Sequence, residues 1–211
     1  MARWNSCNVL HAGKAARQLW QFNAGGKFNL LRAESKLAGE PLPEKLVAKD
    51  WNTLFQPRLN VAWLSADMAF VRVMQLPKAD AAETKSMVEL QLEKISPLPV
   101  TQIVWSYEIL PYIRLGRAGE ELNPHGTGEL QTVVVIMANA HLVEEQLGRL
   151  ETAGYLADRL ELPLLDELRA TKVKENGAWI FPDVGGQEGA CMVAWWYDGV
   201  LQNLSIIHLC G

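Results

Sequence analysis

A glycine-rich segment is the first place where residue types suggest chemistry. Ala24-Gly25-Gly26-Lys27-Phe28 superficially resembles a phosphate-binding loop, in which backbone amides and a lysine hold phosphate. That loop needs a Ser or Thr directly after its lysine to hold magnesium, and this chain has Phe28 there. We therefore interpret residues 23–26, Asn-Ala-Gly-Gly, as the turn of a β-hairpin.

Other motifs for catalysis or metal binding are missing from the sequence. It contains no GxSxG elbow and no HExxH. The four histidines have no ligand spacing: His11, His125, His141 and His208. The acidic pairs Glu120-Glu121 and Glu144-Glu145 are expected to be solvated rather than to work as acid and base. The three cysteines, Cys7, Cys191 and Cys210, have no CxxC spacing, which indicates buried thiols in a reducing compartment.

Tryptophan is unusually frequent, with eight residues in the chain. Trp195 and Trp196 are adjacent in an apolar run that predicts a strand, so their indoles must point to opposite faces of the sheet. One indole then packs in the core. The other faces water, a loop of the same chain or a partner protein, because exposed aromatic residues are enriched in protein interfaces.

Composition excludes several classes of protein. The 211 residues are 49% hydrophobic and 21% charged, as in ordinary folded proteins, and need no disulfide or metal to form a core. A formal charge of −4 lacks the basic excess of proteins that bind nucleic acid. No apolar run approaches the ~20 residues that cross a bilayer, and the first residues are too polar for a secretion signal. We expect a cytoplasmic protein without a transmembrane segment.

The first third of the chain is predicted to be mainly β-structure. Short apolar runs bounded by turn residues mark its strands. The expected strands are 7–10, 17–22, 28–31, 59–64 and 69–76. Before the fourth strand, Val47, Trp51, Leu54 and Phe55 recur with helical spacing, which predicts a helix that ends before Pro57.

A second helix is predicted after residue 80. Asp80 and Glu83 have the spacing of an N-cap residue and its back-reaching carboxylate. Val88, Leu92 and Ile95 then form one apolar stripe, which we expect to pack across neighbouring strands. The sequence Ser96-Pro97-Leu98-Pro99 should end this helix.

The remaining elements alternate between strands and helices. The expected strands are 103–110, 133–137, 178–181, 192–197 and 200–209, and the expected helices are 142–150 and 164–170. Gly154 is expected to cap the first of these helices in a left-handed conformation, and Pro163 to stand at the start of the second. Asp198-Gly199 predicts a tight hairpin turn between the last two strands.

The order of these elements from residue 70 to 170 resembles one family. The chain has a strand ending in Leu76-Pro77, a helix with Glu89 and Glu93, the stop at residues 96–99, a strand with Trp105, and Val133-Val-Val-Ile-Met-Ala138. A helix, Ala153-Gly154, a strand and a leucine-rich helix follow. This succession resembles the actin-like pilus assembly protein PilM and the cytoplasmic part of type II secretion L proteins.

The resemblance implies a mixed α/β fold with a divided organisation. The core would be actin-like, or ribonuclease-H-like, and would carry an inserted strand-helix-strand-strand subdomain, with the second lobe incomplete. The implied segments are 1–69 for the first part of the core, 70–140 for the inserted subdomain, 141–176 for the return helices and 177–211 for the start of the second lobe.

The same resemblance marks where nucleotide would be held, and the chain departs from the pattern there. Actin-like ATPases have an Asp-x-Gly turn after the first strand, whereas this chain has His11-Ala12-Gly13, followed by Lys14. An imidazole is a poor substitute for a carboxylate that positions magnesium. A second such turn is Asp183-Val184-Gly185-Gly186. We expect no cofactor, no bound metal and no hydrolysis of ATP.

The resemblance implies a noncatalytic scaffold at the inner face of the cytoplasmic membrane. Its partners would be other inner-membrane platform subunits of a pilus or secretion system and, in the secretion branch, the assembly ATPase. Two alternatives stay open. The chain is a nucleotide-binding actin-like protein if Gly13, Lys14 and Asp183 converge on one cleft, or an unrelated α/β enzyme whose site residues are scattered along the sequence.

Two surfaces are candidates for binding partners. The first is the predicted helix after Asp80 with its exit, where Met87 and Leu90 lie off the apolar stripe. Glu89 and Glu93 on the same helix are expected to be solvated. The second is the final hairpin, which we expect the rest of a longer chain to cover. The candidate residues are Met87, Leu90, Pro97, Leu98, Pro99, Trp195 and Trp196.

Overall fold

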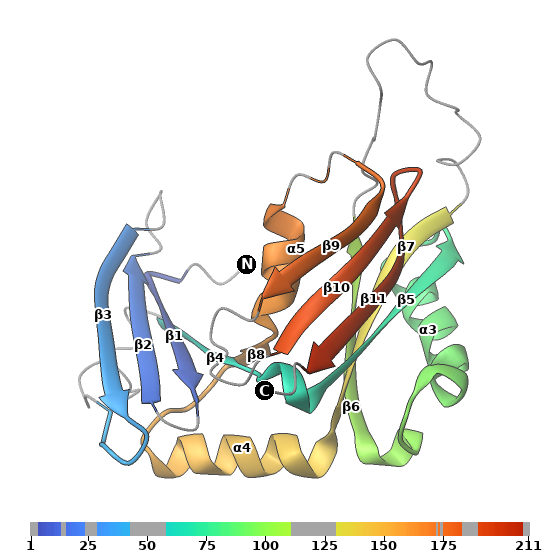
Figure 1. Ribbon diagram of the computed structural model, residues 1–211. Coiled ribbons are helices and arrows are strands. Elements are labelled where there is room, and N and C mark those ends of the chain that lie inside the picture. Colours follow the sequence, from blue (N-terminus) through green and yellow to red (C-terminus); the bar gives the residue numbers. More distant parts are fainter. Residues whose placement is uncertain are drawn as a thin grey trace. The chain divides into compact units, whose positions relative to one another are not determined.

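The computed structural model describes residues 4–13, 16–23, 29–42, 58–110, 130–171, 173, 175–182 and 190–208 of the 211 (Figure 1). They form two compact units, each built from two stretches of chain. Unit 1 comprises Met1–Ser65 and Leu142–Pro163, and unit 2 comprises Ala66–His141 and Leu164–Gly211. Within the described residues, no helix has the length and apolar character needed to span a bilayer.

Unit 1 contains a five-stranded sheet with the order β3-β2-β1-β4-β8 (Figure 1). The strands are β1 (Ser6–Ala12), β2 (Ala16–Asn23), β3 (Asn29–Leu37), β4 (Arg58–Trp63) and β8 (Arg159–Glu161). The pairs β1–β2 and β2–β3 are antiparallel, as short turns allow, whereas β1–β4 and β4–β8 are parallel and need long crossovers. The predicted helix at 47–55 and the turn after Asn23 lie outside the described residues.

One face of the unit 1 sheet packs against helix α4 (Ala140–Thr152) and the chain that follows it. Leu10 pairs with Leu19 on one side and Ala62 on the other, so the three side chains share a face. They form a buried cluster with Leu150 and Tyr155. The chain turns after α4 at Gly154, which has a φ of 84°. The left-handed cap predicted at this glycine is therefore confirmed.

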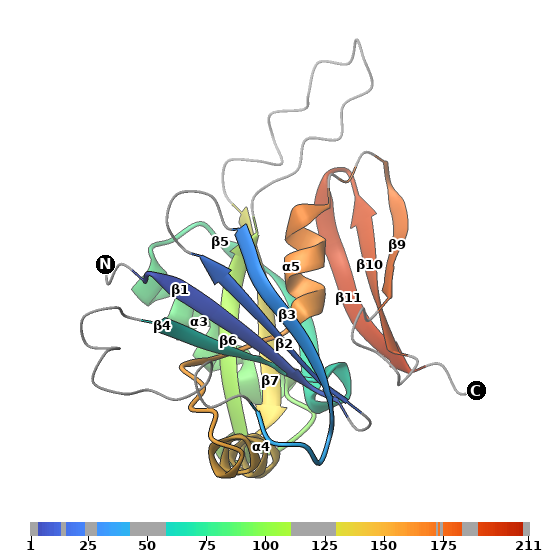
Figure 2. The same cartoon turned by 90° about the vertical axis from the view of Figure 1, so that its left-hand side faces the viewer.

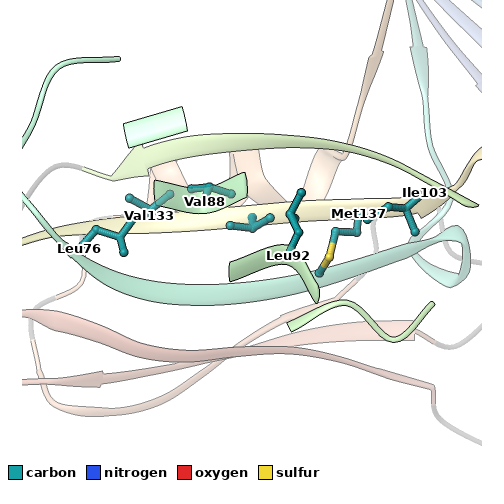
Figure 3. Packing of buried hydrophobic residues seen from close by; sticks show 7 residues of the cluster. Leu76, Val88, Leu92, Ile103, Val133 and Met137 are labelled. Carbon is teal, nitrogen blue, oxygen red and sulfur yellow. The ribbon is translucent and has the colours of Figure 1, made fainter. Parts of the chain in front are cut away.

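Unit 2 contains a three-stranded antiparallel sheet with the order β5-β7-β6. Its strands are β5 (Ala69–Pro77), β6 (Ile103–Leu110) and β7 (Leu130–Asn139), and helix α3 (Ala81–Ile95) packs on one face. The resulting buried cluster, which we call the α3 core, consists of Leu76, Val88, Leu92, Ile103, Val133, Val135 and Met137 (Figure 3). The apolar stripe predicted from Val88, Leu92 and Ile95 is confirmed: the first two side chains are 0% and 2% exposed, and Ile95 is partly buried and packs against the same core.

The second sheet of unit 2 has the order β11-β10-β9. It comprises β9 (Gly177–Pro182), β10 (Ala190–Tyr197) and β11 (Val200–His208), with helix α5 (Pro163–Ala170) beside it in both views (Figures 1 and 2). The turn between β10 and β11 has positive φ angles at Asp198 and Gly199, 49° and 75°. These are the angles of the tight hairpin turn predicted for this dipeptide. Pro163 begins α5, as predicted.

The strand predictions hold closely, with one clear difference at β3. The expected strand at 28–31 covers only the start of β3, which continues to Leu37. The later residues, Arg-Ala-Glu-Ser-Lys, have low strand propensity and are almost all exposed, so pairing with β2 rather than burial keeps them extended. The four consecutive segments expected from the resemblance stay a prediction, because the described units are discontinuous groupings of residues.

Candidate partner-binding surface

Helix α3 presents the first candidate surface, and its ends are well defined. The carboxylate of Asp80 accepts hydrogen bonds from the amides of Ala82 and Glu83, at 2.8 and 2.9 Å. These bonds satisfy two donors that a helix start leaves unpaired. At the other end, the amide of Ser96 donates to the carbonyl of Leu92 at 2.9 Å before Pro97 stops the helix. The surface therefore stands on a rigid element.

The predicted partner residues on α3 differ in their surroundings. Leu90 is 78% exposed and lies away from the α3 core. Met87 is half-buried and packs against that core. This reflects helix geometry, because position 87 borders the stripe formed by Val88 and Leu92, while position 90 lies opposite it. Of the pair, Leu90 alone offers a largely exposed apolar side chain.

The exit from α3 is a compact turn. The hydroxyl of Ser96 donates to the carbonyl of Leu98 at 2.6 Å, and the amide of Leu98 donates back to the same hydroxyl at 3.2 Å. Leu98 packs partly against the α3 core, whereas Pro97 and Pro99 are exposed. Leu98 thus anchors the turn, and the two prolines form its outer surface.

A pocket of about 360 Å³ lies beside α3. We call it the edge pocket, because strand β6 at the edge of the sheet supplies most of its lining. It is lined by Lys85 and Glu89 of α3 and by Trp105, Ser106 and Tyr107 of β6. The Trp105 and Tyr107 rings are stacked with centroids 6.4 Å apart, and the Tyr107 hydroxyl donates to the carbonyl of Ala81 at 2.8 Å. The pocket's aromatic wall is thereby held in place.

The sequence indicated the edge pocket only indirectly. Glu89 was expected to be solvated, and its side chain is indeed half exposed, 3.6 Å from the Lys85 ammonium. Trp105 and Tyr107 occupy alternate positions in β6 and so share a face, which their spacing could have revealed. The spacing of these residues does not reveal that α3 packs over the same face, because that contact depends on tertiary structure.

The final hairpin presents the second candidate surface. Trp195 is 51% exposed and Trp196 only 4%, which confirms that their indoles take opposite faces of the sheet. Trp195 shares its outer face with Ile180 and Ile207, because both pair with residues of β10 that alternate with Trp195. Both isoleucines are exposed as well. This outer face is therefore apolar.

Of the residues at the expected nucleotide loops, the structure describes His11 and Gly13. The His11 ring lies 5.8 Å from the ring of Trp63, which also contacts Trp20 at 5.0 Å. The Gly13 amide donates to the carbonyl of Ala16 at 3.0 Å, so the β1–β2 turn uses the N–H that would hold phosphate. Lys14, Asp183, Gly185 and Gly186 lie outside the described residues. In the part of the chain that the structure describes, no group of acidic, histidine or cysteine side chains could hold a metal ion.

Two of the three cysteines are described, and both are free thiols. Cys191 is buried in β10. Burial raises the pKa of the Cys7 thiol, and the nearby Arg159 guanidinium opposes this only in part. A thiol with a raised pKa is a weak nucleophile at neutral pH, so Cys7 has the properties of a packing residue.

Comparisons with known proteins identify the fold. No family model matches the sequence, and no curated protein matches it. Among solved structures, a chain of the PilM–PilN type IV pilus biogenesis complex superposes with a TM-score of 0.65 at 21% identity, covering 99% of this chain. The chain shares its fold with PilM. It spans 62% of the length of that PilM–PilN chain.

A second solved structure agrees with the PilM likeness. It is the cytoplasmic domain of EpsL, an inner-membrane component of the type II secretion system of Vibrio cholerae. That domain superposes with a TM-score of 0.51 at 13% identity, covering 96% of this chain and 71% of its own. The mixed α/β fold predicted from the sequence is therefore confirmed, together with the resemblance to these two groups of proteins.

Proposed function

We propose that this chain is a noncatalytic scaffold of the inner-membrane platform that serves type IV pilus assembly or type II secretion. The observation that carries the proposal is the likeness to PilM over 99% of the chain, because that relative was solved as part of a complex with PilN. The likeness to the EpsL cytoplasmic domain supports the same kind of assembly. The chain would act at the cytoplasmic face of the membrane and bind other platform subunits and, in a secretion system, the assembly ATPase.

The exposed side of α3 supports a role in binding. Leu90 is an isolated apolar residue on a charged surface, and burying it against a partner would contribute roughly 1.5 kcal/mol or more. Pro97 and Pro99 extend this surface beyond the helix end and add no flexible side chain. Leu90 and the two prolines belong to unit 2, and Leu90 lies outside the α3 core.

A binding experiment with purified platform subunits tests this function. The Leu90→Glu variant should lose binding by about tenfold or more, because a carboxylate replaces the apolar contact. Met87→Glu combined with Leu90→Glu should lose more, although Met87 packs on the core and this variant needs its melting temperature checked. Leu142→Glu on α4 is the matched control, since Leu142 is also exposed, at 44%. Full binding by a folded Leu90→Glu variant would exclude this face of α3.

The alternative function, nucleotide binding, can be distinguished from the scaffold function by a calorimetric titration. The Gly13 amide is engaged within its own turn and His11 packs on Trp63, so neither supports a phosphate site as placed. We expect no heat of binding when ATP with magnesium is titrated into the protein in a calorimeter. ATP turnover that Asp183→Ala abolishes would contradict this expectation and would favour the nucleotide-binding alternative.

A further inference from the structure

The edge pocket has a size and a composition that fit a small molecule. Its volume of about 360 Å³ lies near the lower end of the range for ligand sites, roughly 300 to 1,000 Å³. The lining residues all belong to unit 2 and come from two elements, α3 and β6. Together they supply two aromatic rings, a hydroxyl, a cation and an anion. The scaffold function proposed above uses none of these side chains.

The aromatic wall of the pocket is fixed in place by the protein itself. Trp105 and Tyr107 both belong to β6, and both rings pack against the α3 core. The two rings are stacked with an angle of 30° between their planes, and the Tyr107 hydroxyl is already bonded to the carbonyl of Ala81. A flat group that stacks on this wall therefore loses little free energy in ordering the protein.

The charged wall of the pocket is adjustable by contrast. Lys85 and Glu89 lie one helical turn apart on α3, and the Lys85 ammonium is 3.6 Å from the Glu89 carboxylate. Their side chains are 60% and 50% exposed, and an ion pair with that exposure contributes little to stability. Both side chains are long enough to separate and contact a ligand. The pocket therefore offers a cation and an anion that can exchange partners at small cost.

We propose that the edge pocket binds a free amino acid that carries a guanidinium group, with arginine as the simplest example. The guanidinium plane stacks on Trp105, its paired N–H donors bind the Glu89 carboxylate, and the α-carboxylate of the ligand binds the Lys85 ammonium. This site is independent of the scaffold function, so either proposal can fail without the other.

Each wall of the pocket selects one feature of this ligand. Stacking and bidentate pairing favour a guanidinium over an ammonium, because the guanidinium is planar and less strongly hydrated. A ligand with a cation alone would take Glu89 from Lys85 and leave the Lys85 ammonium without a partner. A ligand with an anion alone would leave the Glu89 carboxylate unpaired in the same way. A zwitterion supplies both partners, so an amino acid fits better than a simple amine or acid.

Titration calorimetry with the full chain tests the ligand by comparing arginine with two analogues. Citrulline has the same shape with a neutral group in place of the guanidinium, and agmatine has the guanidinium without the carboxylate. Arginine should bind saturably, and each analogue should bind roughly tenfold more weakly or worse, because each lacks one charge-assisted contact. No saturable binding of arginine, or equal binding of arginine and citrulline, would overturn the proposal.

Two variants assign the contacts to individual side chains. Glu89→Gln should abolish the preference for arginine over citrulline, whereas Lys85→Met should abolish the preference for arginine over agmatine. Both side chains are exposed and lie outside the α3 core, so the variants should keep the wild-type melting temperature. The control is Glu144→Gln on α4, an exposed position outside the pocket, which should leave all three affinities unchanged. A preference that survives in its variant would overturn the proposal.

A blocked arginine distinguishes the free amino acid from an arginine side chain within a protein. N-acetyl-arginine amide keeps the guanidinium and lacks the free carboxylate, so it should bind as weakly as agmatine. Affinity equal to that of arginine would overturn the choice of a free amino acid, because the Lys85 contact would then contribute nothing.

The position of the ligand is tested by NMR of the tryptophan side chains. The indole N–H signal of Trp105 should shift as arginine is added, because this ring forms the wall on which the guanidinium stacks. The signal of Trp195, an exposed tryptophan on the other sheet of unit 2, should stay unchanged. Saturable binding that leaves the Trp105 signal in place would overturn the proposal.

Discussion

In unit 2 the α3 core is made of apolar side chains, whereas in unit 1 the corresponding layer contains a buried polar network. The Tyr155 hydroxyl lies within hydrogen-bonding distance of the carbonyls of Val61, at 2.8 Å, and Asn8, at 3.2 Å. The Asn8 amide donates to the Asn60 side chain at 3.0 Å. All three of these side chains are completely buried. The buried layer of unit 1 therefore contains hydrogen bonds, whose strength depends on the direction and identity of the bonded groups. The stability of the α3 core depends instead on how well apolar side chains fill its volume.

This difference has a physical consequence for specificity. An apolar core loses stability in proportion to the atoms removed and the space left behind. When a buried polar group loses its hydrogen-bond partner, the free energy of unfolding falls by the desolvation penalty of that group, even if the side-chain volume hardly changes. The network joins β1, β4 and the segment after α4. Its hydrogen bonds can form only when Asn8 of β1 lies opposite Asn60 of β4, so they favour the observed parallel register of the two strands.

The largest effect is expected from Leu92→Ala in the α3 core. Leu92 is 2% exposed, and truncation should lower the free energy of unfolding of unit 2 by about 2 to 5 kcal/mol through lost contact and a cavity. Hydrogen exchange of the β7 amides would report the loss. Leu90→Ala, two residues away and exposed, should change stability by about 0.5 kcal/mol or less. A loss below half a kcal/mol for Leu92→Ala would mean that volume does not control this core.

A smaller effect is expected from Tyr155→Phe, which keeps the ring and removes the hydroxyl. The carbonyl of Val61 then loses a buried donor, which should cost about 1 to 3 kcal/mol. Urea unfolding with exchange of the β4 amides measures this. Tyr107→Phe is the control, because its hydrogen bond to Ala81 is exposed and water can replace it. Equal losses in both variants would contradict the role assigned to burial.

The smallest effect is a dependence on alkaline pH. Burial raises the pKa of Tyr155 above its ordinary value of 10.0, and the neighbouring Cys7 and Asp158 add to this. Above pH ~10 the unfolded chain releases this proton and the folded chain keeps it. Unit 1 stability is therefore complete below pH ~10 and should fall by about 1.4 kcal/mol per pH unit above it. Unfolding of the wild type and Tyr155→Phe between pH 9.5 and 11 should differ by this slope, and parallel curves would refute it.

The elements were more predictable than the contacts between them. Helix α3 followed from Asp80, the stripe at Val88 and Leu92, and Pro97, because caps, periodicity and proline act within a few residues. The opposite exposure of Trp195 and Trp196 followed from strand geometry alone. The fold as a whole was predictable through the order of elements that resembles PilM.

The polar network of unit 1 and the edge pocket could not be predicted in this way. Asn8, Asn60 and Tyr155 are ordinary loop or surface residues by type, and they meet only because β1, β4 and the chain after α4 come together. Glu89 and Trp105 likewise meet only through the packing of α3 on β6. Nothing in local composition distinguishes a solvated glutamate from one that lines a pocket.

The division of unit 1 between two stretches of chain also has a consequence for synthesis on the ribosome. The backbone amide of Asn60 donates to the Asp158 carboxylate at 2.8 Å, and the two residues are 98 positions apart in the sequence. The ribosome adds about 5 to 20 residues per second, so Asp158 is synthesised roughly 5 to 20 s after Asn60 of β4. The α3 core, which lies wholly between Leu76 and Met137, is complete before Asp158 is made. The nascent chain therefore offers the uncovered face of the first sheet, with Leu10 and Ala62, to chaperones while the inserted segment already folds.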